Sequence, residues 1–300
     1  NQIEVGLRLA IALYQFWTVR DYAEEGLPWL EQLLAQANKE ITPTVRANAL
    51  AYASFLAGFR GHRAAQIAYG REAAILAERV GEADKPALVW ALTAQAYGTR
   101  AAGDFETEFT LARRVIQLRR ELGDDYYLGL ALSIYSYTAM SLGKLDTARV
   151  MLDESLPVLR QMGNPYRLAM ALNFSGDLAR CQRDYAQAQT AYEESISLLR
   201  ELDAPRDLAS TLHNLGHACL HLGQVERAHT IFDESMALHQ TQQNRPGAAE
   251  CLIGYAALAL ARGSPSSAAR LLAAAVAIGG GRAIATWAAT RLAYEDCLTR

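Results

Sequence analysis

The sequence predicts an all-α fold, a right-handed α-solenoid of about seven antiparallel helix pairs followed by a C-terminal helix. One observation is a set of positions that end a helical pattern and recur every 40–42 residues. These positions are Arg20, Gly61, Gly103, Gly143, Arg183, Gly223 and Gly263. A second is the apolar fraction of 51% with only eight prolines, which supplies a continuous core and favours helix. A fixed period of this size is typical of a repeat array whose units pack only on their neighbours.

Residues 205–244 show most clearly how one unit is built. Leu212 and Leu215 belong to an apolar stripe at helical spacing, and Gly223 ends this first helix because glycine tolerates a positive φ. A second apolar series covers residues 225–238. Since the connection is only a few residues long, the two helices are expected to be antiparallel neighbours.

The expected units cover residues 1–282 as one array, with a terminal helix over residues 283–300. Their approximate ranges are 3–40, 44–83, 85–124, 125–164, 165–204, 205–244 and 245–280. The helical pattern starts with the first residues and still holds at the last, so we expect the chain to be a fragment of a longer protein. The terminal helix is expected either to cap the stack within the chain or to pair with another copy.

Small residues recur at fixed distances from the turns. Seven residues before the turn, six of the seven units carry a small residue, and Leu13 is the exception. These residues are Ser54, Ala96, Ser136, Gly176, Gly216 and Ala256. Twelve residues after the turn, a serine recurs at Ser155, Ser195 and Ser235. Small side chains at such places let paired helices approach closely.

Charge and cysteine content exclude several classes of protein. The net charge of −3 and the pI of about 6.1 argue against broad binding to nucleic acid, which needs a basic surface. The densest basic run, residues 113–120, is interpreted as a solvated helix face. The four cysteines are widely spaced, which indicates free, buried or half-buried thiols.

Motifs of enzymes and of membrane proteins are absent from the sequence. Gly279-Gly280-Gly281-Arg282 is followed by no Lys-Ser/Thr, so it is interpreted as a break before the terminal helix and not as a phosphate loop. No acid pair or nucleophile motif falls in a predicted pocket, so no catalytic residue is expected and the chain is not expected to be an enzyme. No long apolar run and no signal pattern occur, so a cytoplasmic protein without membrane contact is expected.

Several residues carry a resemblance to a known family. Asn214-Leu215-Gly216, Leu222-Gly223, Ala228, Phe232 and Ser235 resemble the tetratricopeptide repeat (TPR) in a lengthened form of about forty residues. The resemblance is strongest in the fourth to seventh units. Five residues after the turn, the second helix of the last four units carries an alanine, such as Ala228. In the first three units Glu25, Gln66 and Glu108 replace it, so less regular packing is expected there.

The two ends of the chain resemble a more specific group. Phe16-Trp17-Thr18-Val19-Arg20 and the run over residues 267–275 are similar to the helical-repeat region of bacterial LuxR-type and related signal-transduction ATPase regulators. That resemblance implies a non-catalytic ligand- or protein-sensing region of a transcriptional regulator, which does not itself bind nucleic acid. A general TPR scaffold for protein–protein assembly, without a regulatory switch, is the alternative.

The resemblance also implies that the first helix of each pair lines a concave groove. Side chains ten, six and two residues before each turn share one helix face and are expected to project there. We expect a peptide, a protein segment or a small polar ligand to bind this face in the third to sixth units. The candidate residues are Tyr97, Arg100, Tyr137, Asn173, Asp177, Arg180, His213 and His217. Alternatively, the rings only fill a tight superhelix and the arginines pair with acidic neighbours.

A zinc site is a minor alternative for part of this set. His213, His217 and His221 follow one another at a spacing of four, with Asp177 and Cys181 expected on the adjacent helix. Three histidines at this spacing span about 12 Å along a helix and cannot all bind one ion. No metal and no other cofactor is therefore expected.

Overall fold

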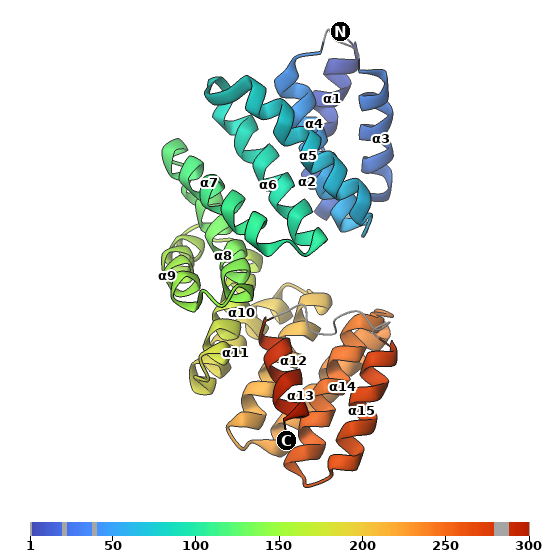
Figure 1. The fold of residues 1–300 in the computed structure, drawn as a ribbon, viewed down its shortest axis with the longest axis vertical. Helices are drawn as coiled ribbons and strands as arrows, with labels where there is room; N and C mark the ends of the chain where they lie inside the picture. The colour runs from blue at the N-terminus through green and yellow to red at the C-terminus, as the bar shows by residue number, and fades with distance from the viewer. Residues whose placement is uncertain (1, 20–22, 38–40, 279–287, 300) are drawn as a thin grey trace. The chain divides into compact units, whose positions relative to one another are not determined.

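The computed structural model describes residues 2–19, 23–37, 41–278 and 288–299, and no strand occurs among them. The chain divides into two compact units, residues 1–131 and residues 132–300. Over residues 43–278, helices follow one another and are joined by short connections (Figure 1). The predicted fold class, an all-α solenoid of antiparallel helix pairs with a C-terminal helix, is confirmed.

The first unit contains the helices that precede residue 132. They are α1 (Gln2–Ala12), α2 (Tyr14–Val19), α3 (Ala23–Gln36), α4 (Pro43–Phe59), α5 (Arg63–Val80), the short 3₁₀ helix η1 (Gly81–Asp84), α6 (Lys85–Ala102) and α7 (Phe105–Leu122). A turn at Leu13 divides the predicted first helix into α1 and α2. Helices α4, α5, α6 and α7 pack in chain order, and α4 also contacts α6 (Figure 1).

The second unit has the same plan. Its helices are α9 (Leu145–Gln161), α10 (Pro165–Cys181), α11 (Tyr185–Glu201), α12 (Pro205–His221), α13 (Val225–Thr241), α14 (Arg245–Ala261), α15 (Pro265–Ile278) and α16 (Ala288–Leu298). Helix α8 (Asp125–Ser141) contains the division between the units. The first helices α10, α12 and α14 contact one another in turn, and α16 packs on α10 and α14.

The turns between helices depend on left-handed backbone. Six predicted turn positions have positive φ: Gly61 (70°), Gly103 (84°), Gly143 (72°), Arg183 (62°), Gly223 (75°) and Gly263 (71°). The seventh, Arg20, lies outside the described residues, as does the glycine run at 279–281. A residue with positive φ turns the chain sharply after the last helical turn, which is why glycine dominates the set.

A second series of left-handed residues connects the second helix of one pair to the first helix of the next pair. It comprises Gly81, Gly123 and Gly163, with Asp203 (φ 49°) and Gln243 (φ 53°) in place of glycine. An Asp or Asn often follows the left-handed residue and caps the next helix. The Asn164 and Asn244 side chains accept hydrogen bonds from the backbone N–H groups of Arg167 (3.1 Å) and Gly247 (3.2 Å). Each turn therefore both ends one helix and starts the next.

The small residues place the paired helices in close contact. A Cβ atom added at Gly216 would lie 2.5 Å from the Phe232 ring, and one at Gly254 would meet the same ring at 2.5 Å. The Phe232 side chain is fully buried between the two glycine-bearing helices. The Tyr192 ring occupies the equivalent place against Gly176. An aromatic ring from the second helix thus fills the space that the missing side chains leave.

The recurring serine joins the two helices of a pair by a buried hydrogen bond. The Ser195 hydroxyl donates to the Ala169 carbonyl at 2.8 Å, and the Ser235 hydroxyl donates to the Ala209 carbonyl at 2.8 Å. Both serines are fully buried. The hydroxyl is satisfied without leaving the apolar interface, which explains why serine recurs at this position.

Two expectations about polar side chains are decided by the structure. The interpretation of residues 113–120 as a solvated face is wrong for Arg119, which is only 4% exposed. Its guanidinium lies between the Trp90 and Tyr127 rings, 4.6 and 4.8 Å from their centroids, and pairs with Asp124 at 2.8 Å. The expectation of buried or half-buried free thiols is confirmed for all four cysteines.

Replacing Gln243 by glycine should stabilise the second unit by about 1 kcal/mol, because a side chain in left-handed backbone strains the chain and glycine removes that strain. Urea unfolding of the Gln243→Gly variant measures the gain. Gln242→Gly is the matched control, since Gln242 has a φ of −85°. Equal effects of the two substitutions would contradict the role of the left-handed turn.

Gly216→Ala should lower the free energy of unfolding by about 1–2 kcal/mol, because overpacking outweighs the better helix propensity of alanine. Phe232→Leu, combined with Gly216→Ala, should recover much of that loss by removing the ring that the new methyl group meets. Thermal or urea unfolding of the four proteins of this cycle gives the coupling energy. Additive effects would show that the ring does not set the helix separation.

Candidate functional site

The structure assigns the candidate residues to the two units. Tyr97 and Arg100 lie on α6 in the first unit and are half-buried. The other six lie in the second unit on α8, α10 and α12, and each is at most 6% exposed. These are Tyr137, Asn173, Asp177, Arg180, His213 and His217. In the second unit, adjacent first helices cover the side chains ten residues before the turn and, apart from Ala257, those six residues before it.

A polar cluster joins α10 to α12 in the second unit. The Arg180 guanidinium donates to the Asn214 side-chain oxygen at 3.1 Å, and the Asn214 amide donates to the Asn173 side-chain oxygen at 3.2 Å. One helical turn after Asn173 on α10, the Asp177 carboxylate accepts a hydrogen bond from the Tyr192 hydroxyl at 2.7 Å. Networks of this kind hold packed helices in a single register when their polar groups are satisfied.

Two histidines extend the cluster along α12. His213 and His217 are each 1% exposed, and their rings meet edge to face with centroids 4.7 Å apart. Both rings also contact Phe232, at 5.8 and 5.2 Å. Among the described residues, neither ring nitrogen of His213 has a hydrogen-bond partner, and Nε2 of His217 has none. These imidazoles therefore fill space between helices as neutral rings.

Burial decides the protonation of the cluster. It lowers the pKa of His213 to about 3 and that of His217 well below its usual value, with Arg180 adding to the effect on both. Burial raises the pKa of Asp177 to about 6, although Arg180 and the Tyr192 hydrogen bond oppose the shift. Burial and the nearby Asp177 raise the pKa of Glu250 to about 7. The cluster therefore holds carboxyl groups that titrate near neutral pH.

The zinc alternative receives no support from the described residues. Within them, no three His, Cys, Asp or Glu side chains are arranged so that they could hold a metal ion. His213 and His217 turn toward the Phe232 ring, and burial raises the pKa of the Cys181 thiol to about 11. A thiol in this state is a poor ligand.

The first unit carries a row of aromatic rings on successive first helices. The row begins at Tyr14 on α2, continues through Tyr52 and Phe55 on α4 and Trp90 on α6, and reaches Tyr127 at the start of α8. Successive centroids lie 4.8, 5.9, 6.2 and 5.0 Å apart, mostly in edge-to-face geometry. Tyr97 joins the row through Phe55 at 5.6 Å. Apart from Phe55, these rings are half-buried and so keep part of their surface in solvent.

Arg100 pairs with an acid in the first unit. Its Nη2 lies 2.5 Å and its Nε 2.7 Å from Oε1 of Glu108, which is fully buried. Glu108 lies five residues after its turn, where the last four repeats carry an alanine such as Ala228. The alternative that the arginines pair with acidic neighbours thus describes Arg100, and the ion pair explains how α7 tolerates a buried glutamate.

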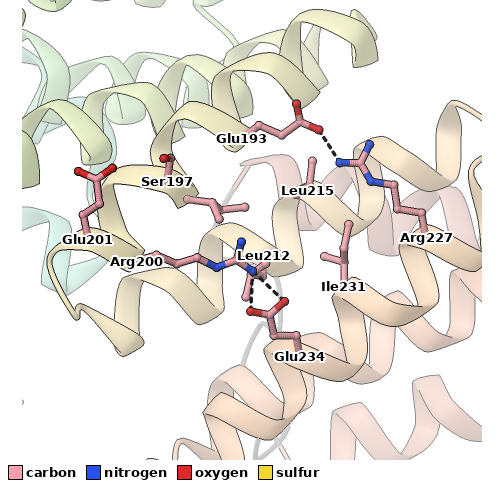
Figure 2. A pocket seen from close by; sticks show the side chains of 10 residues that line it. Glu193, Ser197, Arg200, Glu201, Leu212, Leu215, Arg227, Ile231 and Glu234 are labelled. Atoms are coloured by element: carbon pink, nitrogen blue, oxygen red, sulfur yellow. Dashed lines mark hydrogen bonds and ion pairs between the residues drawn. The ribbon is translucent and has the colours of Figure 1, made fainter.

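A cavity of about 500 Å³ lies between α11, α12 and α13 in the second unit (Figure 2). Its apolar lining includes Leu212, Leu215 and Ile231, and two ion pairs lie at its rim. Glu193 pairs with Arg227 at 2.5 Å, and Arg200 pairs with Glu234 at 2.7 Å. Each of these four rim charges already has an opposite partner, so they offer no uncompensated charge to a ligand.

These rim pairs belong to a ladder between second helices that was not predicted from the sequence. Arg160 pairs with Glu194 at 2.9 Å. Arg200 and Glu234, which lie one forty-residue repeat later, pair at 2.7 Å. The signal was an Arg–Glu spacing of 34 residues that recurs after forty. Trp90 and Glu250 were not predicted either, because they lie thirteen residues before their turns, one helical turn before the outermost of the positions ten, six and two residues before a turn.

Asp177→Asn should flatten one part of the pH dependence of stability. Because the folded pKa of Asp177 is above its ordinary value, the folded state keeps a proton between about pH 4 and 6 that the unfolded chain releases. The wild type therefore loses stability as the pH rises through this window, by up to about 3 kcal/mol. The stability of the asparagine variant relative to wild type should rise from pH 4 to pH 7.5.

Urea unfolding at several pH values measures this difference. Tyr192→Phe should instead make the loss of stability with rising pH larger than in the wild type, since removing the hydroxyl donor raises the pKa of Asp177 further. A difference between Asp177→Asn and wild type that does not change with pH would show that the carboxyl group is not held in its neutral form.

Comparisons with known proteins support the repeat fold. Residues 207–279 match the family model of the tetratricopeptide repeat. No curated protein sequence matches the chain. Among the helices described, none is long and apolar enough to cross a membrane.

Solved structures resemble nearly the whole chain. The apo form of RapI is 10% identical over 91% of this chain and 97% of its own, with a TM-score of 0.72. The quorum sensor NprR from B. thuringiensis is 13% identical over 99% of this chain and 87% of its own, with a TM-score of 0.64. A signal transduction ATPase with a tetratricopeptide repeat sensor from Pyrococcus horikoshii is 13% identical over 91% of this chain, with a TM-score of 0.66. The chain spans only 42% of that ATPase. At these identities the likeness shows the fold, and the chain has the fold of a TPR-like helical-repeat domain.

Proposed function

We propose that the chain is the non-catalytic sensor or interaction region of a bacterial transcriptional regulator of the LuxR-type or signal-transduction ATPase group. Its ligand is a peptide, a protein segment or a small polar molecule that binds the first helices of the pairs. The region uses no metal or cofactor and does not itself bind nucleic acid or membrane.

The observation that carries this proposal is the aromatic row of the first unit. Half-buried tyrosine and tryptophan rings follow one another on α2, α4, α6 and α8, and each pair of neighbours is in contact. Such rings offer large contact area at a small cost in side-chain entropy, and their polar atoms can pair with a peptide backbone. The row favours an extended peptide or a protein segment over a small charged molecule.

The polar cluster of the second unit supports the proposal in a different way. Asn173, Arg180 and Asn214 fix the separation of α10 and α12, so the exposed ends of these helices form a preorganised surface. Preorganisation lowers the entropy cost of binding a partner. In this proposal the candidate residues Asp177, His213 and His217 act beneath the contact surface, and Tyr97 lies within it.

Similar proteins are consistent with a sensing role. NprR is described as a quorum sensor, and the Pyrococcus horikoshii ATPase carries its tetratricopeptide repeats as a sensor. For the regulator context, the gene beyond these residues is decisive. An ATPase module before the repeats or a helix-turn-helix after them would support it, whereas a full-length protein with neither would leave the general scaffold.

Peptides selected from a displayed random library on the full chain should bind through the aromatic row. Tyr97→Ala should weaken a selected peptide about tenfold, the loss expected when one aromatic contact of roughly 1.4 kcal/mol is removed. The matched control is Tyr69→Ala on the second helix α5, where a half-buried tyrosine donates a hydrogen bond to Glu31 at 2.9 Å.

Isothermal titration with the selected peptides gives the dissociation constants. Circular dichroism melting of both variants confirms that they fold. If Tyr69→Ala weakens binding and Tyr97→Ala does not, the ligand binds the second helices and the proposal is wrong.

A further inference from the structure

Helix α16 lies on the first helices of the second unit. It packs on α10 and α14, and Figure 1 shows it in dark red against the labelled helices of this unit. On its inner side Ala293 is 5% exposed and Cys297 is 8% exposed. Cys297 belongs to the same buried cluster as Ile253 and Ala256 of α14. The helix therefore covers part of the surface that the proposed function assigns to a ligand.

An acidic side chain of α16 faces two basic groups of this surface. The Asp296 carboxylate lies 3.5 Å from Nη2 of Arg183 and 3.9 Å from Nε2 of His221. Arg183 is the left-handed residue that connects α10 to α11, and His221 is the last residue of α12. The His221 ring is stacked on Tyr185 with centroids 4.1 Å apart, so its position is fixed by packing. Arg183 and His221 thus form a basic patch on this surface.

Several features indicate that the contact of α16 with this surface is weak. Its two buried side chains, Ala293 and Cys297, are small, Tyr294 packs on the same cluster but is only partly buried, and Leu298 at its end is 60% exposed. Oδ2 of Asp296 is buried and accepts no hydrogen bond from the described residues, and neither ion pair is closer than 3.5 Å. A helix of eleven residues is also too short to persist alone in water, so α16 is helical because it is docked.

We propose that α10, α12 and α14 form a binding surface for an amphipathic acidic helix, and that α16 is its intramolecular occupant. A partner helix with small residues at the places of Ala293 and Cys297, an aromatic residue at the place of Tyr294 and a carboxylate at the place of Asp296 exchanges with α16. A carboxylate that reaches hydrogen-bonding distance of Arg183 gains a stronger, charge-assisted contact than Asp296 makes. This inference assigns a helical partner to the first helices of the second unit, and it depends on the proposed function only in taking the ligand to be a chain segment.

Because α16 is part of the same chain, a partner helix displaces it only above a minimum affinity. A segment held on the same chain competes at an effective concentration of about millimolar, so a partner must bind more tightly than α16 to displace it. Weak partners with an unsuitable sequence are thereby excluded, and release of α16 reports the binding of a suitable one.

Thiol labelling of the full chain tests whether α16 is docked. N-ethylmaleimide should modify Cys297 slowly in the wild type, with peptide mass mapping to separate this thiol from the other three. Ala293→Arg places a charge in the contact and should speed labelling of Cys297 about tenfold or more. Leu298→Arg adds the same charge at an exposed position of α16 and should change the rate less than about twofold. Equal rates in the two variants would overturn the assignment.

A synthetic peptide of residues 288–299 tests the surface itself. The fluorescein-labelled peptide should bind the Ala293→Arg chain, whose own helix is released, at least about tenfold more tightly than it binds the wild type. A peptide with Asp296→Lys should lose this binding and regain it on the chain that combines Ala293→Arg with Arg183→Glu. Binding that ignores the charge swap, or equal binding to wild type and Ala293→Arg, would overturn the proposal.

Light scattering separates the intramolecular occupant from a second copy. If α16 docks within its own chain, protection of Cys297 is the same at micromolar and at tenfold higher concentration. Protection that grows with the dimer fraction would show that α16 of another copy occupies the surface, which contradicts the proposal. Neither result depends on Tyr97, so a failure here is distinct from a failure of the peptide-binding function of the first unit.

Discussion

The close approach of the helices is the constraint on which the rest of the structure depends. At Gly216 and Gly254 the backbones come so near the Phe232 ring that even a methyl group would not fit. A serine hydroxyl bonded to a backbone carbonyl of the neighbouring helix joins such interfaces without an exposed polar group. Left-handed turns reverse the chain direction after each helix, so the same contact repeats from one helix pair to the next. Burial in one dimension, and not a central core, stabilises such an array.

This packing determines which polar side chains can meet a ligand. In the second unit, neighbouring first helices cover the residues ten and six before the turn, so Asn173, Asp177 and His213 become part of the interior. Their cost of burial is offset by hydrogen bonds or by loss of charge, as the raised pKa of Asp177 and the lowered pKa of His213 indicate. Side chains at the helix ends, such as Arg183 and His221, remain accessible to a partner. Asp296 of α16 lies beside both of these side chains.

Period, turns and small residues could be predicted because each follows from local chemistry. A glycine at a helix end favours left-handed backbone whatever the rest of the chain does, and Gly103 and Gly223 are turns as expected. Side-chain exposure could not be predicted, since helical spacing defines a face but not how near the next helix lies. Arg119 was expected in solvent and is buried between two rings, because Trp90 and Tyr127 come from helices that no local pattern relates. The docking of α16 was left open for the same reason.

Hydrogen exchange of the full chain, followed by mass spectrometry, tests most directly whether α16 is a docked and separable element. We predict that amides of α16 exchange more slowly than those of the free peptide of the same residues, but much faster than those of α12 and α14. Such intermediate protection is the mark of a segment that opens on its own. Exchange as slow as that of α12 would make α16 an inseparable part of the array. Exchange as fast as that of the free peptide would show that it is not docked.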